Sequence, residues 1–481
     1  MTPTRHVSKV VVVGTGAGGA VAAATLAEAG IDTIIVEEGV QYGPSDHADV
    51  VTSLSRMYVN AGMSLALGWP PIPIPLGCVV GGTTAINSST CFRPPREKVA
   101  AWGGPAYEVL EPFMAKVEQR INAAPADVES LGGNWRVMKR GCDALGLEIK
   151  PLVHNLRDCR GAGRCQFGCP TGAKLSTDRT FIPDALAAGA RMLTGHRVER
   201  VLMKAGRAAG VEGVSAQGRF AIQADAVVLA MGALAGPAFL LKHRLANSSG
   251  RVGRGLHIHP ASRVVAEFDE VVDGYVGLSQ GAYIDRWADR GIMLEGIFLP
   301  PGLMMASLPG VGAELKGLAA AYRRLSAFGV MITDTTSGRV FPSRLGFPYF
   351  TMYQATREDA EHLRFGITRL VEIYLAAGAR RVFTGFAPVP EIRNRDGLAR
   401  LEAAQVKPAH FEILAFHPLG TCPMGANPKT SVVSYDLQTH DVPGLCVMDG
   451  SVIPSPLGVN PQIAIMTLAM RAAARLAETL R

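Results

Sequence analysis

The chain lacks the features that mark several large classes of protein. It contains no apolar run long enough to cross a bilayer. It contains no run rich in lysine and arginine, and its net charge of +7 with a pI near 9.0 is mild, so we expect no nucleic-acid binding. It also has no internal repeats and no low-complexity linker. With 48% hydrophobic residues over 481 positions, the composition predicts a large core divided between two lobes.

A Gly-x-Gly-x-x-Gly motif occupies residues 14–19. The apolar, β-branched run Lys9–Val13 before it predicts a buried parallel strand, and the Ala-rich stretch Ala20–Gly30 after it predicts a helix. A second strand is expected at Thr33–Val36. The order of strand, glycine turn, helix and strand is typical of a dinucleotide-binding unit, whereas an isolated glycine motif would fit an ordinary βα turn.

The residues of this unit have distinct expected roles. Gly14 permits a tight turn, Gly16 allows the backbone to approach a pyrophosphate, and Gly19 allows the helix to pack closely on the strand. Ala17 lies where the helix begins, beside the expected phosphates. Glu37 ends the second strand, 18 residues after Gly19, and is placed to bind a ribose hydroxyl.

Three later segments are also rich in glycine and polar side chains: 77–87, 417–425 and 445–467. Together with residues 14–19, they resemble the glucose-methanol-choline (GMC) family of FAD oxidoreductases. Residues 227–241 and 252–254 also match that family, and only about 260–412 carries no readable motif of it. The resemblance therefore extends over nearly the whole chain.

Two branches of the family are the most similar. They are the fatty-alcohol oxidases and the catalytic subunits of bacterial FAD glucose dehydrogenases. Cys91 stands where the family usually has an aromatic residue or alanine, with Phe92 one place later. This departure looks like the fatty-alcohol oxidase branch.

The resemblance implies an α/β fold, in which a Rossmann-like FAD-binding domain is interleaved with an α+β substrate domain containing an antiparallel sheet. The expected segments are 1–45, 77–100, 186–260 and 411–481 for the FAD-binding domain, 46–76 for a lid or approach segment, and 101–185 and 261–410 for the substrate domain with a Cys-rich segment at 159–169. Pro70, Pro71, Pro73 and Pro75 predict an extended approach to the second glycine loop, neither strand nor helix.

The resemblance also implies further residues that bind FAD. These are Gly81, Gly82, Thr83, Asn87, Val198, Asp449, Gly450, Pro461 and Gln462. Family members with a histidyl–FAD bond carry histidine immediately before the asparagine of the second loop. Ile86 occupies that position here, so we expect the FAD to be held without a covalent bond.

His417 and Asn460 are the candidate catalytic residues. Oxidation of an alcohol by flavin moves a hydride from carbon to N5, while the hydroxyl proton goes to a base, and a histidine suits that role. A neighbouring amide can hold the same oxygen. The resemblance implies that His417 is the base and Asn460 its hydrogen-bonding partner, in a pair similar to that of cholesterol oxidase. An isolated histidine would more often be structural.

Asn460-Pro461 also predicts the start of a helix that runs to Leu480, with asparagine as N-cap and proline as first helical residue. The dipole of this helix would favour negative charge on the reduced flavin by about 1 to 2 kcal/mol. The simpler interpretation is that Asn460 only caps the helix, and this role is compatible with stabilisation of the reduced flavin by the helix dipole.

Three of the eight cysteines lie close together, at Cys159, Cys165 and Cys169. Their spacing and the glycines between them allow three thiolates to face one metal centre. The segment resembles the one that holds a three-iron (3Fe-4S) cluster in the FAD glucose dehydrogenases, and it also resembles a fatty-alcohol oxidase segment without an established cluster. The alternatives are structural thiols and a disulfide, which a cytoplasmic location disfavours.

The substrate is the least determined part. Met293–Met305 is apolar and rich in methionine, which predicts either a pocket for an apolar alcohol (long-chain, terpenoid or sterol-like) or plain core. The electron acceptor is dioxygen, a quinone or a cytochrome partner. Alternative functions are a sugar dehydrogenase that passes electrons through an iron–sulfur cluster to a cytochrome, a non-redox lyase, and an electron-transfer subunit.

The expected location is the cytoplasm. The first strand is expected by about residue 8, which leaves no room for a cleaved signal peptide. We expect contact with a membrane surface if the substrate is a lipid.

Overall fold

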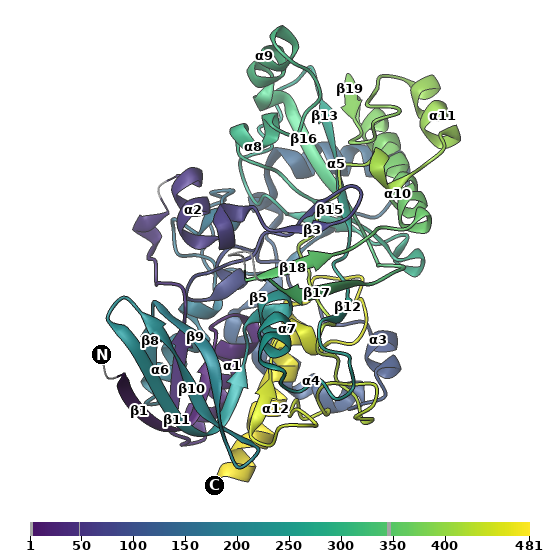
Figure 1. Cartoon of the computed structure of the whole chain (residues 1–481). Coiled ribbons are helices and arrows are strands. Elements are labelled where there is room, and N and C mark those ends of the chain that lie inside the picture. Colours follow the sequence, from purple (N-terminus) through teal and green to yellow (C-terminus); the bar gives the residue numbers. More distant parts are fainter. Residues whose placement is uncertain (1–2, 48, 344–347) are drawn as a thin grey trace.

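A computed structural model of the chain describes residues 3–47, 49–343 and 348–481. Two lobes are visible in Figure 1. The lower lobe contains a mostly parallel sheet and both ends of the chain, the upper lobe contains an antiparallel sheet, and a third sheet lies between them.

The lower sheet is built from segments that are far apart in sequence. Its strand order is β8 (Arg191–Thr194), β2 (Thr33–Glu37), β1 (Thr4–Val13), β11 (Gly218–Leu229), β10 (Arg207–Ser215) and β9 (His196–Lys204), and β21 (Leu445–Val447) also pairs with β11. The pairs β1–β2, β1–β11, β2–β8 and β11–β21 are parallel. Segments from both ends of the chain therefore complete one sheet.

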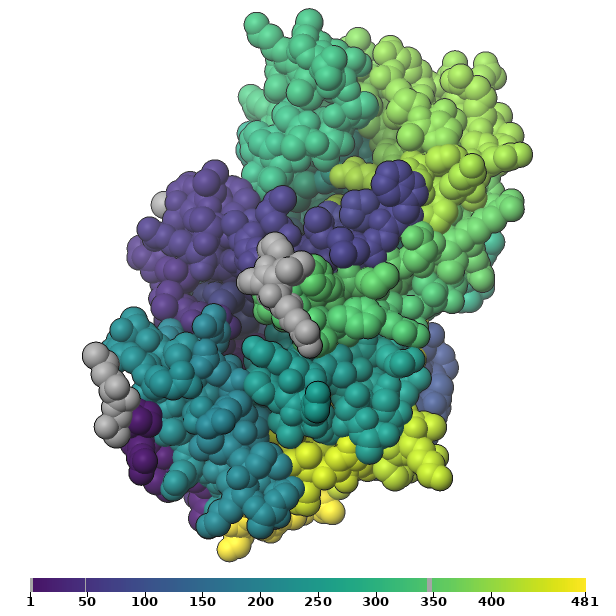
Figure 2. Space-filling view, in the orientation of Figure 1, coloured from purple at the N-terminus to yellow at the C-terminus, as the bar shows by residue number. Residues whose placement is uncertain are grey.

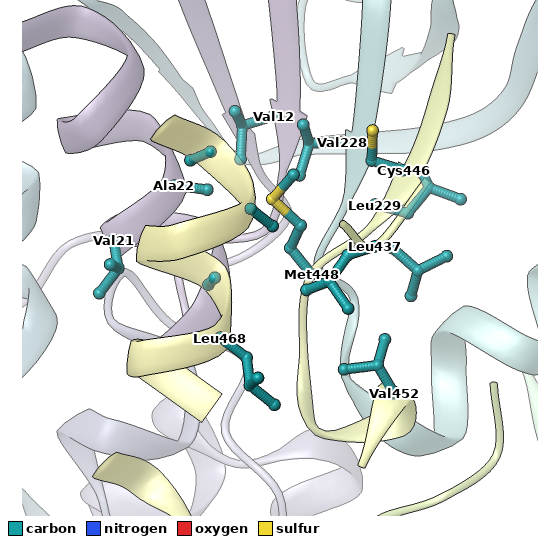
Figure 3. Close-up of a cluster of buried hydrophobic side chains, with 14 of the residues drawn as sticks. Val12, Val21, Ala22, Val228, Leu229, Leu437, Cys446, Met448, Val452 and Leu468 are labelled. Carbon is teal, nitrogen blue, oxygen red and sulfur yellow. The ribbon is translucent and has the colours of Figure 1, made fainter. Parts of the chain in front are cut away.

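Two helices, α1 (Ala17–Glu28) and α12 (Gln462–Leu480), pack together beside this sheet. Figure 3 shows Val12 and Val228 of the sheet, Ala22 of α1 and Leu468 of α12 in one buried cluster. Residues 10–13 of β1 are almost fully buried, as expected for a parallel strand that is covered on both faces. The predicted strand, turn and helix are all present, and α1 begins three residues earlier than expected, at Ala17.

The upper sheet is antiparallel. Its strand order is β20 (Glu391–Ile392), β19 (Arg381–Phe383), β13 (Ala261–Glu267), β16 (Leu325–Ile332), β15 (Ile292–Gly296), β14 (Ala282–Ile284) and β6 (Lys150–Pro151). Helices α5 (Gly132–Ala144) and α10 (Arg357–Ala376) pack against each other and against β16. The interleaved α/β and α+β architecture with an antiparallel sheet is thus confirmed.

The third sheet joins β12 (Arg254–Leu256), β17 (Gly338–Pro342), β18 (Tyr349–Met352), β3 (Leu65–Leu67) and β4 (Ile72–Pro73) in that order. Helix α7 (Gly232–His243) packs against β17 and β18. The proline-rich approach was expected to contain no strand, but Ile72–Pro73 forms β4. An edge strand tolerates proline because one side of it needs no backbone donor.

The remaining helices and strands connect these sheets. They are α2 (Val50–Met57), α3 (Arg96–Ala101), α4 (Tyr107–Ile121), α6 (Phe181–Ala187), α8 (Pro301–Met305), α9 (Ala313–Ala320), α11 (Arg395–Ala403), β5 (Ala123–Pro125) and β7 (Val153–Asn155). Among the described residues, no helix has both the length and the apolar composition that a membrane span requires.

Candidate active site

The first glycine turn leaves open space at one position only. A Cβ added at Gly14 would lie 2.3 Å from the carbonyl oxygen of Ala230, and one added at Gly19 would lie 2.1 Å from that of Gly14. A Cβ added at Gly16 would meet nothing within 4 Å. Gly16 is also the N-cap of α1, without a side-chain cap, and Ala17 opens the helix. The N-terminal N–H groups of α1 therefore face a space that suits a pyrophosphate.

Glu37 is buried beside this turn. Its Oε2 accepts hydrogen bonds from the backbone N–H of Thr15 (2.9 Å) and from Thr15 Oγ1 (2.6 Å), and its Oε1 accepts one from the N–H of Gly39 (2.8 Å). Burial raises the pKa of the Glu37 carboxyl. The side chain therefore holds the turn in shape, and Oε1, which accepts one bond, can still accept a further bond from a ribose hydroxyl.

The second glycine loop touches the first. The backbone N–H of Gly81 donates to Thr15 Oγ1 at 2.9 Å, and a Cβ added at Gly82 would lie 2.9 Å from the Cα of Gly16. Thr83 Oγ1 accepts a bond from the N–H of Gly77 at 3.1 Å. The two loops form one wall around the open space at Gly16. Because this wall is made of glycine backbone, no side chain of these glycines fills the space, and FAD can approach the backbone closely.

The same wall continues to the start of α12. Asn87 Nδ2 donates to Gln462 Oε1 at 3.1 Å, and Gln462 Nε2 donates to the carbonyl of Thr90 at 2.8 Å. The predicted N-cap was wrong by one residue, because the helix begins at Gln462 with Pro461 as N-cap and no side-chain cap. The amide of Asn460 is turned toward His417 instead.

Asp449 lies at the other end of the site and is buried. Its Oδ2 accepts a bond from the N–H of Gly232 (2.8 Å), and its Oδ1 accepts one from the N–H of Ser451 (2.9 Å). Burial raises the pKa of the Asp449 carboxyl. Gly450 follows it in a short 3₁₀ turn. Val198 is buried in β9 opposite Gly213, and its contact with FAD stays a prediction.

The predicted catalytic pair comes together. Asn460 Nδ2 lies 3.3 Å from His417 Nε2, although the two residues are 43 positions apart. Burial lowers the pKa of His417 to about 4, so its imidazole is neutral at neutral pH. The structure therefore brings the two side chains together, and their catalytic roles stay a prediction.

His259 is a neighbour that the sequence analysis did not identify. Its Nε2 accepts bonds from the backbone N–H groups of Leu457 (3.0 Å) and Gly458 (3.2 Å). Burial holds the pKa of His259 well below its ordinary value, so this neutral ring carries its proton on Nδ1. That atom lies 3.3 Å from His417 Nδ1. A bond from His259 Nδ1–H to His417 Nδ1 leaves the His417 proton on Nε2, whereas a bond from the Asn460 amide N–H to His417 Nε2 leaves it on Nδ1, so the two contacts favour opposite tautomers of His417.

Glu295 on β15 is the second missed residue. It is buried, and its Oε2 accepts a bond from Gln280 Nε2 at 2.8 Å. Burial raises the pKa of Glu295 to about 7, opposed by a hydrogen bond from Asn460. Within the described residues, Glu295 Oε1 and Asn460 Oδ1 have no hydrogen-bond partner in protein. In the sequence, Glu295 is the only acidic residue in the apolar run Met293–Phe298, and this pattern could have identified it as a candidate site residue.

The three clustered cysteines are not brought together as metal ligands, so the structure gives no support to the cluster alternative. All are free thiols, and in the part of the chain that the structure describes no three His, Cys, Asp or Glu side chains gather as metal ligands. Lys174 organises this loop instead. Its buried Nζ donates to the carbonyls of Ala85 (2.8 Å), Asn87 (3.0 Å) and Cys165 (2.8 Å), and burial lowers its pKa to about 8. Cys159 and Cys169 accept bonds from the N–H groups of Gly161 and Lys174, both at 3.4 Å.

The methionine-rich segment divides between two cores. Met293 on β15 is buried in the core of the lower lobe, and Met304 on α8 is buried with Phe298 and Leu318 in a small separate cluster. The core reading of this segment is thus supported for both methionines.

The open space at Gly16 generates a prediction. Gly16→Ala adds a methyl group where FAD is expected, so the variant should keep the melting temperature of the parent apoprotein yet bind FAD at least ~10-fold more weakly. Gly19→Ala, its matched control, places a methyl group 2.1 Å from a carbonyl oxygen and should lower the apoprotein melting temperature. Differential scanning fluorimetry and FAD titration measure both. Unchanged FAD affinity in Gly16→Ala would contradict the assigned cradle.

Comparison with family models agrees with these features. Residues 54–261 and 346–469 match two models described as GMC oxidoreductase, and residues 9–48 match a model described as FAD binding domain. Together these matches include both glycine loops, His417 and Asn460.

Comparison with known proteins gives relatives along nearly the whole chain. A GMC-type oxidoreductase of Mycobacterium tuberculosis is 34% identical over 473 residues, which cover 96% of this chain and 75% of the relative. Another GMC-type oxidoreductase, from Sinorhizobium fredii, is 31% identical, with 96% and 93% covered. Long-chain-alcohol oxidase FAO4B of Arabidopsis thaliana is 28% identical, with 98% and 67% covered.

Solved structures share the fold at low sequence identity. Pyridoxine 4-oxidase of Mesorbium loti superposes with a TM-score of 0.72 at 20% identity, covering 97% of this chain and 99% of the other. A formate oxidase superposes with a TM-score of 0.74 at 14% identity, covering 100% of both chains. Since the family models, the relatives and the glycine cradle agree, this chain belongs to the GMC oxidoreductase family and is an FAD-dependent alcohol oxidoreductase.

Proposed function

We propose that this enzyme oxidises an apolar alcohol, of long-chain, terpenoid or sterol type, to an aldehyde or ketone. Non-covalently bound FAD supplies the hydride acceptor, and segments 1–45, 77–100, 186–260 and 411–481 hold it. The observation that carries the proposal is a pair of buried polar atoms without protein partners, Asn460 Oδ1 and Glu295 Oε1, beside His417. Similarity to the long-chain-alcohol oxidases supports an apolar substrate.

In this proposal His417 and Asn460 bind the substrate oxygen. The hydrogen bond from His259 favours the tautomer with the proton of neutral His417 on Nε2, and in this proposal that atom donates to the substrate oxygen once the oxygen has displaced the amide N–H of Asn460 from it. A neutral ring with its proton on Nε2 does not fit the base role predicted from sequence. The pair instead orients the hydroxyl and stabilises the negative charge that grows on its oxygen.

Glu295 takes the hydroxyl proton. Its Oε1 is free of protein partners, and its other oxygen is fixed by Gln280. Gln280 is in turn fixed by Thr90 Oγ1, which donates to Gln280 Oε1 at 2.6 Å, close to the second glycine loop. As the O–H bond breaks, the proton moves to Glu295, and the carbonyl forms as the C–H bond of the same carbon breaks and its hydride leaves to the acceptor that bound FAD would supply.

The proposed final electron acceptor is dioxygen. The relatives of Arabidopsis thaliana are named as oxidases, which supports oxygen over a quinone or a cytochrome. Hydrogen peroxide formed in step with aldehyde would agree with this acceptor. Turnover that requires an added quinone or cytochrome would contradict it.

The substrate class generates a direct test. Under anaerobic conditions, a long-chain primary alcohol such as dodecanol should bleach the flavin absorption band of the purified holoenzyme, whereas glucose should not. Asn460→Leu should bleach ~10²-fold more slowly, because the substrate hydroxyl loses the amide that orients it. Bleaching by glucose alone would replace the apolar alcohol with a sugar. Absence of bleaching by alcohols of any class would remove the proposed oxidation.

The base assignment generates a pH prediction. A base acts when deprotonated, so kcat/KM of the parent enzyme should rise through pH about 7, as Glu295 ionises. Glu295→Gln should remove this limb and lower kcat/KM by ~10² to 10⁴. If the limb lies instead near pH 4 and Glu295→Gln retains the parent rate, His417 is the base, since burial lowers its pKa to about 4.

A further inference from the structure

The third sheet has an unusual outer face. In a sheet with one face packed on the core, the face toward solvent normally carries polar side chains. The covered side here contains Ala66, Ile72, Val340 and Thr351, which are at most 1% exposed. Among the next residues along the same strands, Leu65, Leu67, Phe341 and Met352 are exposed and apolar, whereas Arg339 is exposed and charged.

The pairing register arranges these outward side chains in two rows. One row runs through Met352 and Leu67, which are paired across β18 and β3 and are 53% and 48% exposed. The other row contains Phe341 on β17 (37%) and Leu65 on β3 (42%). Directly opposite residues on neighbouring strands share a face, so the rows form one surface.

Two further side chains extend this surface at the ends of β3. Met63 and Trp69 are each 72% exposed. We call the six residues the apolar sheet face: Met63, Leu65, Leu67, Trp69, Phe341 and Met352. In Figure 2 the dark blue-purple segment that includes β3 lies beside the green segment of β17 and β18, at the waist of the molecule. Contiguous exposed apolar area of this kind marks an interaction site.

The edge of the face is basic. Arg254 on β12 pairs with Arg339 on β17, and Arg339 pairs with Met352, so both arginines continue the first row. Both are exposed, and in the described ranges neither has an ion-pair partner. The five strands of this sheet contain no aspartate or glutamate. The partner of this face is therefore apolar and anionic.

We propose that the apolar sheet face docks the enzyme on the surface of a membrane that contains anionic lipids. Trp69 and the aliphatic side chains enter the boundary between headgroups and acyl chains, and Arg254 and Arg339 bind lipid phosphates. A two-fold contact with a second copy of the chain fits less well, because the face offers its arginines no acid. Docking depends on this surface alone and not on the proposed substrate.

Vesicle sedimentation with the full-length holoenzyme tests the proposal. The parent should bind vesicles of 70% phosphatidylcholine and 30% phosphatidylglycerol at least 10-fold more tightly than vesicles of phosphatidylcholine alone, which is about the order expected for two basic side chains. Because salt screens this attraction, 0.5 M salt should remove most of the difference. The double variants Leu67→Ser/Trp69→Ser and Arg254→Gln/Arg339→Gln should each lose about 10-fold in binding.

Val311→Ser is the matched control, because Val311 is 84% exposed just before α9, on the other lobe. It should bind as the parent does, and flavin absorbance and melting temperature confirm that each variant is folded. The proposal fails if the parent binds anionic vesicles no better than neutral ones, or if Val311→Ser loses as much binding as the double variants. A parent dimer in size-exclusion chromatography that Leu67→Ser/Trp69→Ser dissociates, without vesicle binding, would assign the face to self-association and overturn it.

Discussion

The close contact between two glycine loops is the constraint on which the rest of the site depends. Gly16 and Gly82 approach so closely that a Cβ added at Gly82 would lie 2.9 Å from the Cα of Gly16, and Thr15 links the second loop and Glu37 through its hydroxyl and backbone. The contact leaves the N-terminus of α1 open and brings the second loop, through Asn87 and Gln462, to the start of α12. The positions of the catalytic side chains follow from that frame.

The candidate catalytic site is then a chain of polar groups across both lobes. It begins at Thr90 after the second glycine loop and passes through Gln280 and Glu295 of the upper lobe. It continues to Asn460 before α12 and to His417. Each of these groups is costly to bury alone, and the chain satisfies most of them mutually while leaving atoms free where a hydroxyl can bind.

Burial has opposite effects on the two ionisable groups of this chain. It lowers the pKa of His417 and raises that of Glu295, because a low-dielectric environment disfavours the charged form of each. Both groups are therefore mostly or partly neutral near pH 7, which suits a site that binds an uncharged alcohol.

The third sheet, between the lobes, provides a surface away from this site. Its inner face packs on α7, and its outer face remains apolar and basic-edged.

The sequence by itself determined the parts of the protein that depend on local order. The motif 14–19 lies between a strand and a helix, so the turn, α1 and the position of Glu37 could be predicted, as could the family and its pair His417 and Asn460. The predicted start of α12 was wrong by one residue, because the amide of Asn460 contacts His417 and does not cap the helix.

Only the tertiary structure decided which distant residues join the site. His259 and Glu295 lie in a region without readable motifs, and they reach His417 and Asn460 through strand pairing in the upper sheet and through the loop at 457–458. The cysteine spacing permitted a metal centre, but the buried Lys174 draws the loop onto backbone carbonyls instead. Spacing along a chain limits what can meet, whereas packing and hydrogen bonding between separate segments decide what does.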